Sequence, residues 1–374
     1  MITIMKKSNL LLGLLVFLVL SGCSSSNNIK KYKEEFTVIS TRHDRVTEIM
    51  NNMTLEEKVG QLFFARMPVS NVKEAIQTYH LGGLIIFDAN LENESYDSLK
   101  AKLSSYQEVA NIPLFIASDE EGGYVTRLSS QNIVDKRFKS PLELYNAGGM
   151  NAVINESKRK SETLLDLGIN LNLAPVVDYT SDRDSFIFYR TLGQSFERTL
   201  DYISKVTSTM QSIGVGSTLK HFPGYGHNED SHLDLVFDTR SRQAIDKDLL
   251  LFKQGIDAGA NSIMVSHNII KSIDPNSPAS VSKDVIDIIR NDLNFNGVVM
   301  TDDLDMKGIT KYTGQNQAAL RALQAGNDLV MTSQYEKQIP YIIQAINDGN
   351  LSMERVNQSV YRILAMKYDL NLLK

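Results

Sequence analysis

The sequence predicts a single (β/α)8 barrel, and three observations support that fold class. Eight short runs along the chain are almost continuously apolar, which is typical of parallel strands buried on both faces. Amphipathic helical patterns alternate with these runs. Ionisable residues end or follow five of the runs, and the active sites of such barrels lie at the C-terminal ends of the strands. This spacing favours a TIM-type barrel over a doubly wound sheet.

The elements can be assigned in order along the chain. A first helix is expected after Thr54, because Thr54 and Glu57 have the spacing of a capping box. The expected strands are 61–67, 82–87, 113–118, 170–178, 217–222, 262–267, 297–302 and 328–333. The expected helices include 96–111, 151–167, 200–213, 242–258, 283–293, 316–325, 335–348 and 352–370. No linker interrupts this alternation, so residues 39–374 are predicted to form one domain.

Composition narrows the choice of partners. The 374 residues are 42% hydrophobic and 22% charged, which is ordinary for a globular protein. The net charge of −5 gives no electrostatic reason to expect nucleic acid as a partner. There are no tryptophans but 15 tyrosines, so tyrosine would have to supply any aromatic stacking platform. We expect a monomer.

The N-terminus predicts a membrane anchor. Lys6 and Lys7 precede an apolar stretch, 10–20, that is short for a bilayer span and typical of a signal peptide. The sequence Leu-Ser-Gly-Cys at 20–23 resembles the bacterial lipobox, and Cys23 is the only cysteine. Residues 1–22 are therefore predicted to be a lipoprotein signal peptide, and 23–38 a lipidated cysteine with a flexible tether. This places the protein on a cell membrane, facing outside the cytoplasm; a plain secretory signal is the alternative.

The stretch 220–234, KHFPGYGHNEDSHLD, has the densest set of proton-transfer groups in the chain. It follows an apolar run, so a rigid strand ends where a polar loop begins, which is where catalytic residues usually lie. The chain has no G-x-S-x-G elbow or phosphate-binding loop, and its one cysteine is assigned to lipidation. Two chemistries remain: glycoside hydrolysis by carboxylates, and metal-assisted hydrolysis with ligands from His221, His227, Asp230 and His232.

Several motifs then carry a family resemblance. The segment 220–226 (KHFPGYG) with Asp230-Ser231-His232 resembles the signature of glycoside hydrolase family 3, in its β-N-acetylglucosaminidase branch. Four further segments resemble motifs of that family in the same order: 53–61 (MTLEEKVGQ), 118–127 (SDEEGGYVTR), 172–178 (NLAPVVD) and 301–306 (TDDLDM). Together they extend over nearly the whole body of the chain.

The resemblance implies a retaining β-N-acetylhexosaminidase that needs no cofactor or metal. Asp302 would be the nucleophile, and His232, paired with Asp230, the general acid/base. The residues implied to hold a terminal N-acetylglucosamine are Asp119, Arg127, Arg190, Lys220 and His221. A protein outside the cytoplasmic membrane would meet peptidoglycan or its muropeptide fragments as substrate. A family 3 β-glucosidase or other β-hexosidase, and a catalytically silent sugar-binding lipoprotein, are the alternatives.

Some assignments stay open at this point. Asp303 is an alternative to Asp302 as the nucleophile. Asp178 is expected to brace the loop after the fourth strand, and Glu120 and Glu121 to hold arginine side chains. His267 is either a pocket wall or a core histidine.

The chain also departs from the family pattern in two places. Tyr225 stands where the family usually has histidine, and three residues instead of four separate Gly226 from Asp230. The ring-binding arginine is assigned to Arg190, over a register that would put Gln194 there.

Overall fold

The computed structural model describes residues 26–226, 228–231 and 233–373. Cys23 and the predicted signal peptide lie outside these residues, as do His227 and His232. The chain divides at Asn52 into two compact units. Within the described residues, no helix combines the length and the apolar character that a membrane span requires.

The first unit contains helix α2 (Ser26–Asn52). Residues 26–38 are therefore helical where the sequence predicted a flexible tether. The charged run at 30–35, KKYKEE, consists mostly of good helix formers with opposite charges four residues apart, and these features favour a helix over an extended chain. The boundaries predicted for the signal peptide and the catalytic domain stay predictions.

The second unit, from Asn52 onward, is the predicted barrel. Eight strands pair in parallel in the order β10-β1-β2-β3-β4-β5-β7-β9. A parallel bridge between Met300 and Leu329 joins β9 to the chain entering β10 and brings the sheet close to a closed barrel. The strands are β1 (Phe63–Arg66), β2 (Gly83–Ile86), β3 (Phe115–Ser118), β4 (Leu171–Asn172), β5 (Gly216–Phe222), β7 (Ser262–Val265), β9 (Val298–Thr301) and β10 (Val330–Thr332).

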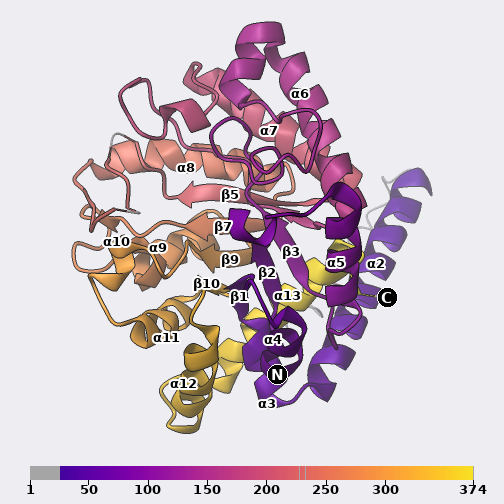
Figure 1. Cartoon of the computed structure of the whole chain (residues 1–374). Helices are drawn as coiled ribbons and strands as arrows, with labels where there is room; N and C mark the ends of the chain where they lie inside the picture. Colours follow the sequence, from indigo (N-terminus) through magenta and orange to yellow (C-terminus); the bar gives the residue numbers. More distant parts are fainter. Residues whose placement is uncertain (1–25, 227, 232, 374) are drawn as a thin grey trace. The chain divides into compact units, whose positions relative to one another are not determined.

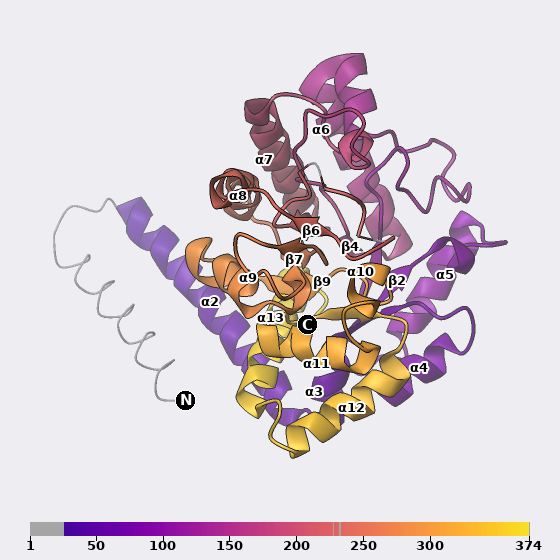
Figure 2. The same ribbon diagram turned by 90° about the vertical axis from the view of Figure 1, so that its left-hand side faces the viewer.

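All eight predicted strands are confirmed. They could be recognised in the sequence because they are buried. Both faces of nearly every strand are covered, so the apolar runs in the sequence are continuous. A separate small sheet pairs β6 (Phe237–Asp238) with β8 (Ile269–Ile270), which lie in the connections that follow β5 and β7. The strands lie at the centre of this unit, with α6, α7 and α8 on one side and α11 and α12 on the other (Figures 1 and 2).

The helices of the barrel unit are α3 (Leu55–Gln61), α4 (Val72–Tyr79), α5 (Tyr96–Gln107), α6 (Pro141–Leu167), α7 (Phe196–Ile213), α8 (Arg242–Asp257), α9 (Lys283–Asp287), α10 (Lys307–Thr310), α11 (Gln315–Ala325), α12 (Tyr335–Asn347) and α13 (Met353–Asp369). Most of them lie at the predicted positions, whereas α4 and α10 were not predicted. The capping box is confirmed: Thr54 Oγ1 accepts from the Glu57 N–H at 3.2 Å, and Glu57 Oε2 accepts from the Thr54 N–H at 2.9 Å.

Helix α6 begins ten residues before its predicted start at 151. Ser140 caps it by accepting from the Glu143 N–H at 3.2 Å, and a proline occupies its first turn. The helical path is interrupted at Gly148 and Gly149, where Gly149 has φ of 64°. These glycines broke the periodic pattern and hid the first part of the helix from sequence analysis.

Candidate active site

Strand ends bring most of the predicted site residues to one end of the barrel. Asp119 directly follows β3, and Asp302 directly follows β9. Lys220 and His221 are among the last three residues of β5. Parallel strands have their C-terminal ends on the same side, so these groups converge. Arg127 and Arg190 come from the connections that follow β3 and β4, and their side chains join the same cluster.

Lys220 is the centre of this cluster. Its Nζ lies 2.7 Å from Asp119 Oδ1 and 2.7 Å from Glu121 Oε1. Burial alone would lower the pKa of Lys220, but the two carboxylates outweigh burial and raise the pKa. Asp119 also lies 3.1 Å from Arg127 Nη2. Burial would raise the pKa of Asp119, but Lys220 and Arg127 lower it, so all three groups are charged.

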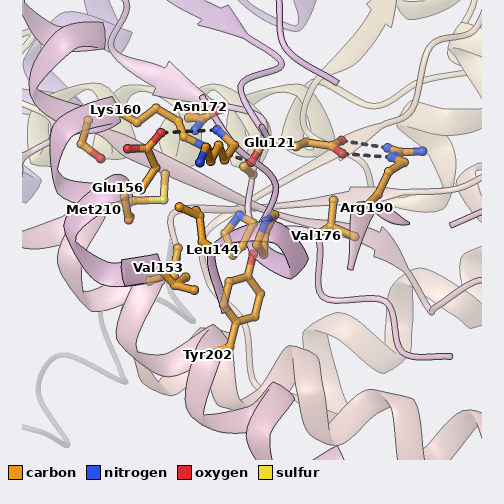
Figure 3. Close-up of a pocket in the computed structure, with 17 residues that line it drawn as sticks. Glu121, Leu144, Val153, Glu156, Lys160, Asn172, Val176, Arg190, Tyr202 and Met210 are labelled. Carbon is orange, nitrogen blue, oxygen red and sulfur yellow. Dashed lines mark hydrogen bonds and ion pairs between the residues drawn. The ribbon is translucent and has the colours of Figure 1, made fainter. Parts of the chain in front are cut away.

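Arg190 forms a bidentate pair with Glu121. Its Nε and Nη2 donate to the two carboxylate oxygens at 2.9 and 2.8 Å, as drawn in Figure 3. The pair confirms the expectation that Glu121 holds an arginine. Burial opposes ionisation of Glu121, but the charges of Arg190 and Lys220 keep its pKa well below the usual value.

Glu120 does not hold an arginine side chain in this way, so that expectation was wrong. Its carboxylate accepts from the N–H groups of Arg127 and Leu128 at 3.0 and 2.8 Å and from the hydroxyls of Ser118 and Thr126. Burial raises the pKa of Glu120. The Glu120 side chain therefore stabilises the loop that carries Arg127. Glu120 and Glu121 are adjacent, and their side chains point in different directions.

The hydrogen bonds of His221 define its tautomer. Arg190 Nη2 lies 3.1 Å from His221 Nε2, and a guanidinium can only donate, so Nε2 is the acceptor. His221 Nδ1 therefore carries the proton and donates to Asp178 Oδ2 at 2.8 Å. Both ring nitrogens are engaged, which leaves His221 without a lone pair for the metal site considered from the sequence. Among the residues described, no group of three potential ligands is placed to hold a metal ion.

Asp178 braces the loop that follows β5 and not the loop after β4 that was expected, because its own segment pairs with β5 through Val176 and Lys220. Besides the His221 ring, it accepts from the backbone N–H of His221 at 3.1 Å and of Tyr225 at 2.7 Å. Three donors from one loop thus converge on a single buried carboxylate. The arrangement fixes the direction of the His221 imidazole and the start of the glycine-containing segment beyond it.

Asp302 and Asp303 have different surroundings. Asp302 continues the β9 ladder through its N–H, which donates to the Val265 carbonyl at 2.8 Å, and its Oδ1 accepts from the Asp303 N–H at 2.8 Å. Burial raises the pKa of Asp303 to about 7, and its carboxyl group lies 3.3 Å from Arg66. A retaining nucleophile must be ionised, so these surroundings favour Asp302.

His267 is a core histidine. Its Nδ1 lies 2.7 Å from Ser280 Oγ, and its Nε2 donates to the Asp303 carbonyl at 2.9 Å. The side chain is fully buried. The open choice between pocket wall and core is therefore decided in favour of the core.

The segment that carries the predicted acid/base is described at Asp230 and Ser231 but not at His232. Ser231 is fully buried, and its Oγ lies 2.7 Å from Tyr225 Oη. The Ser231 carbonyl accepts from the Gly308 N–H at 3.0 Å. Burial raises the pKa of Tyr225 well above its usual value, and the charge of Asp302 adds to this effect, so the phenol stays protonated beside the predicted nucleophile. Tyr225 and Ser231 were not among the predicted site residues.

A small pocket lies behind the cluster, between the barrel and helices α6 and α7 (Figure 3). Its volume of about 30 Å³ is enough for a water molecule but not for a sugar. Lys160 lines it and donates to the carbonyls of Glu120 and Glu121 at 2.7 and 2.8 Å. Burial lowers the pKa of Lys160 to about 8. Lys160 thus supports the turn that presents Glu121 rather than contacting a substrate.

Comparisons with known proteins show the family of this chain. Residues 54–366, well over half of the chain, match the family described as glycosyl hydrolase family 3 N terminal domain. The beta-hexosaminidase LpqI of Mycobacterium tuberculosis is 29% identical over 324 residues, which cover 83% of this chain and 82% of that protein. A beta-hexosaminidase of Nitrosomonas eutropha is 31% identical over 271 residues, covering 69% of this chain and 76% of that protein.

Solved structures give the same result. A family 3 beta-N-acetylglucosaminidase from Paenibacillus superposes with a TM-score of 0.79 at 30% identity, covering 86% of this chain. This chain spans 63% of that longer protein. The structure of M. tuberculosis LpqI superposes with a TM-score of 0.78 at 27% identity, covering 86% of this chain and 96% of that one. The chain is a glycoside hydrolase and belongs to glycosyl hydrolase family 3.

Proposed function

We propose that this protein is a retaining exo-β-N-acetylhexosaminidase that removes terminal β-linked N-acetylglucosamine. One observation carries the proposal: Glu121 joins Asp119, Arg127, Arg190, Lys220 and His221 into a single bonded cluster at the C-terminal end of the barrel. Carboxylate oxygens accept and cationic groups donate, so such a cluster can hold the hydroxyl groups of one sugar ring from both directions. The relatives named beta-hexosaminidase support N-acetylglucosamine as that sugar.

The proposed reaction uses Asp302 as the nucleophile and the pair Asp230 and His232 that the family motif predicts. In the first step, Asp302 bonds to the anomeric carbon while the glycosidic C–O bond breaks, and His232 gives its proton to the leaving oxygen. In the second step, water attacks the glycosyl-enzyme, His232 takes a proton from that water, and Asp302 leaves. Asp230 fixes the imidazole tautomer of His232. These roles of Asp230 and His232 are predictions from the family motif.

A panel of aryl glycosides tests the activity. The proposal expects hydrolysis of 4-nitrophenyl β-N-acetylglucosaminide, little or no hydrolysis of the β-glucoside, and no effect of a chelator. Preference for the glucoside would support a β-glucosidase instead. Sugar binding without turnover would support a silent lipoprotein, and loss of activity with chelator would revive a metal site.

The nucleophile is tested by substitution and by labelling. Asp302→Ala should lower kcat by about 10⁴-fold or more, because it removes the group that forms the covalent intermediate. Added azide should restore turnover and give the α-glycosyl azide, since it attacks from the face the carboxylate occupied. Asp303→Ala is the matched control and should show no azide rescue. A fluorinated substrate analogue should label Asp302, and a label on any other residue would overturn the assignment.

The location of the enzyme forms a separate part of the proposal. We propose that Cys23 is lipidated, that the protein is a monomer held on the outer side of a membrane, and that its natural substrates are peptidoglycan-derived glycans. Cys23→Ser should move the protein from the detergent to the aqueous phase in a cloud-point extraction. Equal partitioning of the two forms would contradict the anchor, and elution of the detergent-solubilised protein as a dimer would contradict the monomer.

A further inference from the structure

Two tyrosines form an exposed aromatic corner beside the sugar-binding cluster. The side chain of Tyr124 is 80% exposed and that of Tyr189 is 47% exposed. Their ring centroids lie 6.2 Å apart, and the ring planes meet at 84°. Single exposed apolar residues are normal on a protein surface. Two exposed aromatic rings in contact at nearly a right angle, in a chain without tryptophan, form a more specific surface.

The corner is tied to the site through the Glu121–Arg190 pair. Tyr124 lies three residues after Glu121, and Tyr189 directly precedes Arg190. The bidentate contact between Glu121 and Arg190 therefore joins the two loops that carry the tyrosines. Arg190 in turn contacts His221 at 3.1 Å. The charged side chains point inward to the cluster, while the neighbouring tyrosines face solvent.

The backbone that carries Tyr124 and the ring of Tyr189 are each held by their own loop. Gly122 and Val125 form a tight antiparallel bridge around Tyr124, in which the Gly122 N–H donates to the Val125 carbonyl at 3.0 Å. Gly122 has φ of 100°, and a Cβ there would lie 2.2 Å from the Lys139 carbonyl oxygen, so the turn requires glycine. The ring of Tyr189 packs edge-on against buried Phe188 at 5.3 Å. A surface held in this way loses little freedom when a ligand binds.

We propose that Tyr124 and Tyr189 form a subsite for the sugar ring that follows the terminal N-acetylglucosamine, so that the preferred substrate is a β-linked glycan rather than a small glycoside. This inference rests on the proposed function. The axial C–H groups of a pyranose form an apolar face that stacks on an aromatic ring, and the tyrosine hydroxyls can bond to its hydroxyls. The occupant is thus a second pyranose of the substrate itself.

The test compares two substrates that differ only beyond the scissile oxygen. Methyl β-N-acetylglucosaminide has no second ring, and N,N′-diacetylchitobiose has one. Tyr124→Ala and Tyr189→Ala should each lower kcat/KM for the disaccharide by about tenfold, mainly through KM, because a stacked ring contributes on the order of one decade of affinity. The methyl glycoside should change by less than about twofold, since the residues that hold its ring are untouched.

Two controls separate stacking from a general loss of stability. Tyr124→Phe keeps the ring and should keep most of the disaccharide activity. Leu250→Ala removes an exposed apolar side chain on α8 and should change neither substrate. Equal losses on both substrates, or no loss on the disaccharide, would overturn the subsite while leaving the proposed function standing. Failure of the wild-type protein to hydrolyse either substrate would overturn both.

Discussion

Two buried lysines at opposite ends of the same barrel have opposite pKa shifts. Lys220, at the C-terminal end, lies 2.7 Å from each of two carboxylates, and its pKa is raised. Lys367 lies on α13 at the N-terminal end, where its Nζ donates to Gln61 Oε1 at 2.5 Å, and the Phe115 ring lies 5.0 Å away. Burial lowers the pKa of Lys367 well below its usual value. Both side chains are buried, so the direction of the pKa shift depends on whether carboxylates lie beside the amine.

The two lysines differ in what their side chains do: Lys220 is part of a charged cluster, and Lys367 is part of the packed interior. Lys220 stays charged because two carboxylates face it, and those carboxylates stay charged because Arg127 and Arg190 also contact them. Among the described residues, Lys367 contacts an amide oxygen and an aromatic ring, so it packs as a long apolar side chain with a polar tip. The C-terminal end therefore maintains a set of ions ready for a polar ligand, and the N-terminal end does not.

The N-terminal end also contains a buried ion cluster, in which Asp328 is bonded to several groups of the protein itself. Asp328, just before β10, is contacted by Arg290, Arg355 and Arg362. It also accepts from the Val299 N–H at 3.1 Å and the Ser359 hydroxyl at 2.8 Å. Burial would raise the pKa of Asp328, but the three arginines lower it. Its oxygens are used within the fold, so this cluster stabilises the barrel without offering a binding site.

The strongest test of the comparison is Lys220→Met. This change leaves Asp119 and Glu121 with one cation fewer, and breaking a buried pair costs about 3–5 kcal/mol, on the order of 10³-fold in kcat/KM where substrate binding depends on it. The measurement is kcat/KM on an aryl N-acetylglucosaminide together with a thermal melt. Lys367→Met is the matched control and should keep kcat/KM within about twofold. Similar losses in both variants would break the comparison.

Asp328→Ala should affect stability and not chemistry. It leaves three buried arginines without their shared anion, so the free energy of unfolding should fall by about 3–5 kcal/mol. The kcat of the folded fraction, measured well below the melting temperature, should be unchanged. Asp201→Ala, which breaks the exposed pair with Lys205, should cost less than about 1 kcal/mol. A large loss of kcat at full folding would place Asp328 in the site after all.

Tyr225→Phe tests whether the acid/base segment is positioned from the β5 loop. The change removes only the hydroxyl that contacts Ser231, a bond of about 0.5–1.5 kcal/mol, so kcat should fall by up to about tenfold. KM should stay nearly constant, because the residues that hold the sugar are unchanged. Tyr106→Phe on α5 is the control for removal of a buried-tyrosine hydroxyl. A change in KM alone would count against a positioning role.

The last test of the comparison is the pH dependence at Lys367. Its folded pKa lies below the unfolded value of about 10.4, so between these two values the unfolded chain binds more protons. This group's contribution to the free energy of unfolding is complete above pH 10.4 and is lost as pH falls toward the folded pKa, by up to about 1.4 kcal/mol per unit.

Urea unfolding of Lys367→Met between pH 7 and pH 9.5 should therefore show a shallower rise with pH than the wild-type protein. Lys158→Met, at an exposed position on α6, is the control and should keep the wild-type slope. Identical slopes in all three proteins would mean that Lys367 is charged in the folded state, and the contrast with Lys220 would disappear.

Much of the fold was predictable because burial on both faces makes strands visible as apolar runs. The sequence also predicts the residues at strand ends, since Asp119, Lys220 and Asp302 directly follow or end those runs. Helix α4 was missed because its eight residues are too few for a periodic pattern to stand out. Helix α2 was missed because charge-rich segments are typical of both helices and flexible chain.

The pairing within the site was less predictable. Glu120 and Glu121 are identical in type and adjacent in sequence, yet one bonds its own loop and the other bonds Arg190 and Lys220. Only the backbone direction at that turn distinguishes them. The contact between Tyr225 and Ser231 likewise depends on how a glycine-containing loop folds back, and residue spacing alone does not determine this.

The Glu121–Arg190 pair also limits how this enzyme can be re-engineered. The loops 119–127 and 187–190 are far apart in sequence but depend on each other, because each supplies half of a buried ion pair. A grafted loop that lacks Arg190 would leave Glu121 with Lys220 as its remaining cation, and one that lacks Glu121 would leave the buried Arg190 guanidinium without its carboxylate. Recombination between family members should therefore tolerate crossovers outside these two loops and select against crossovers that separate them.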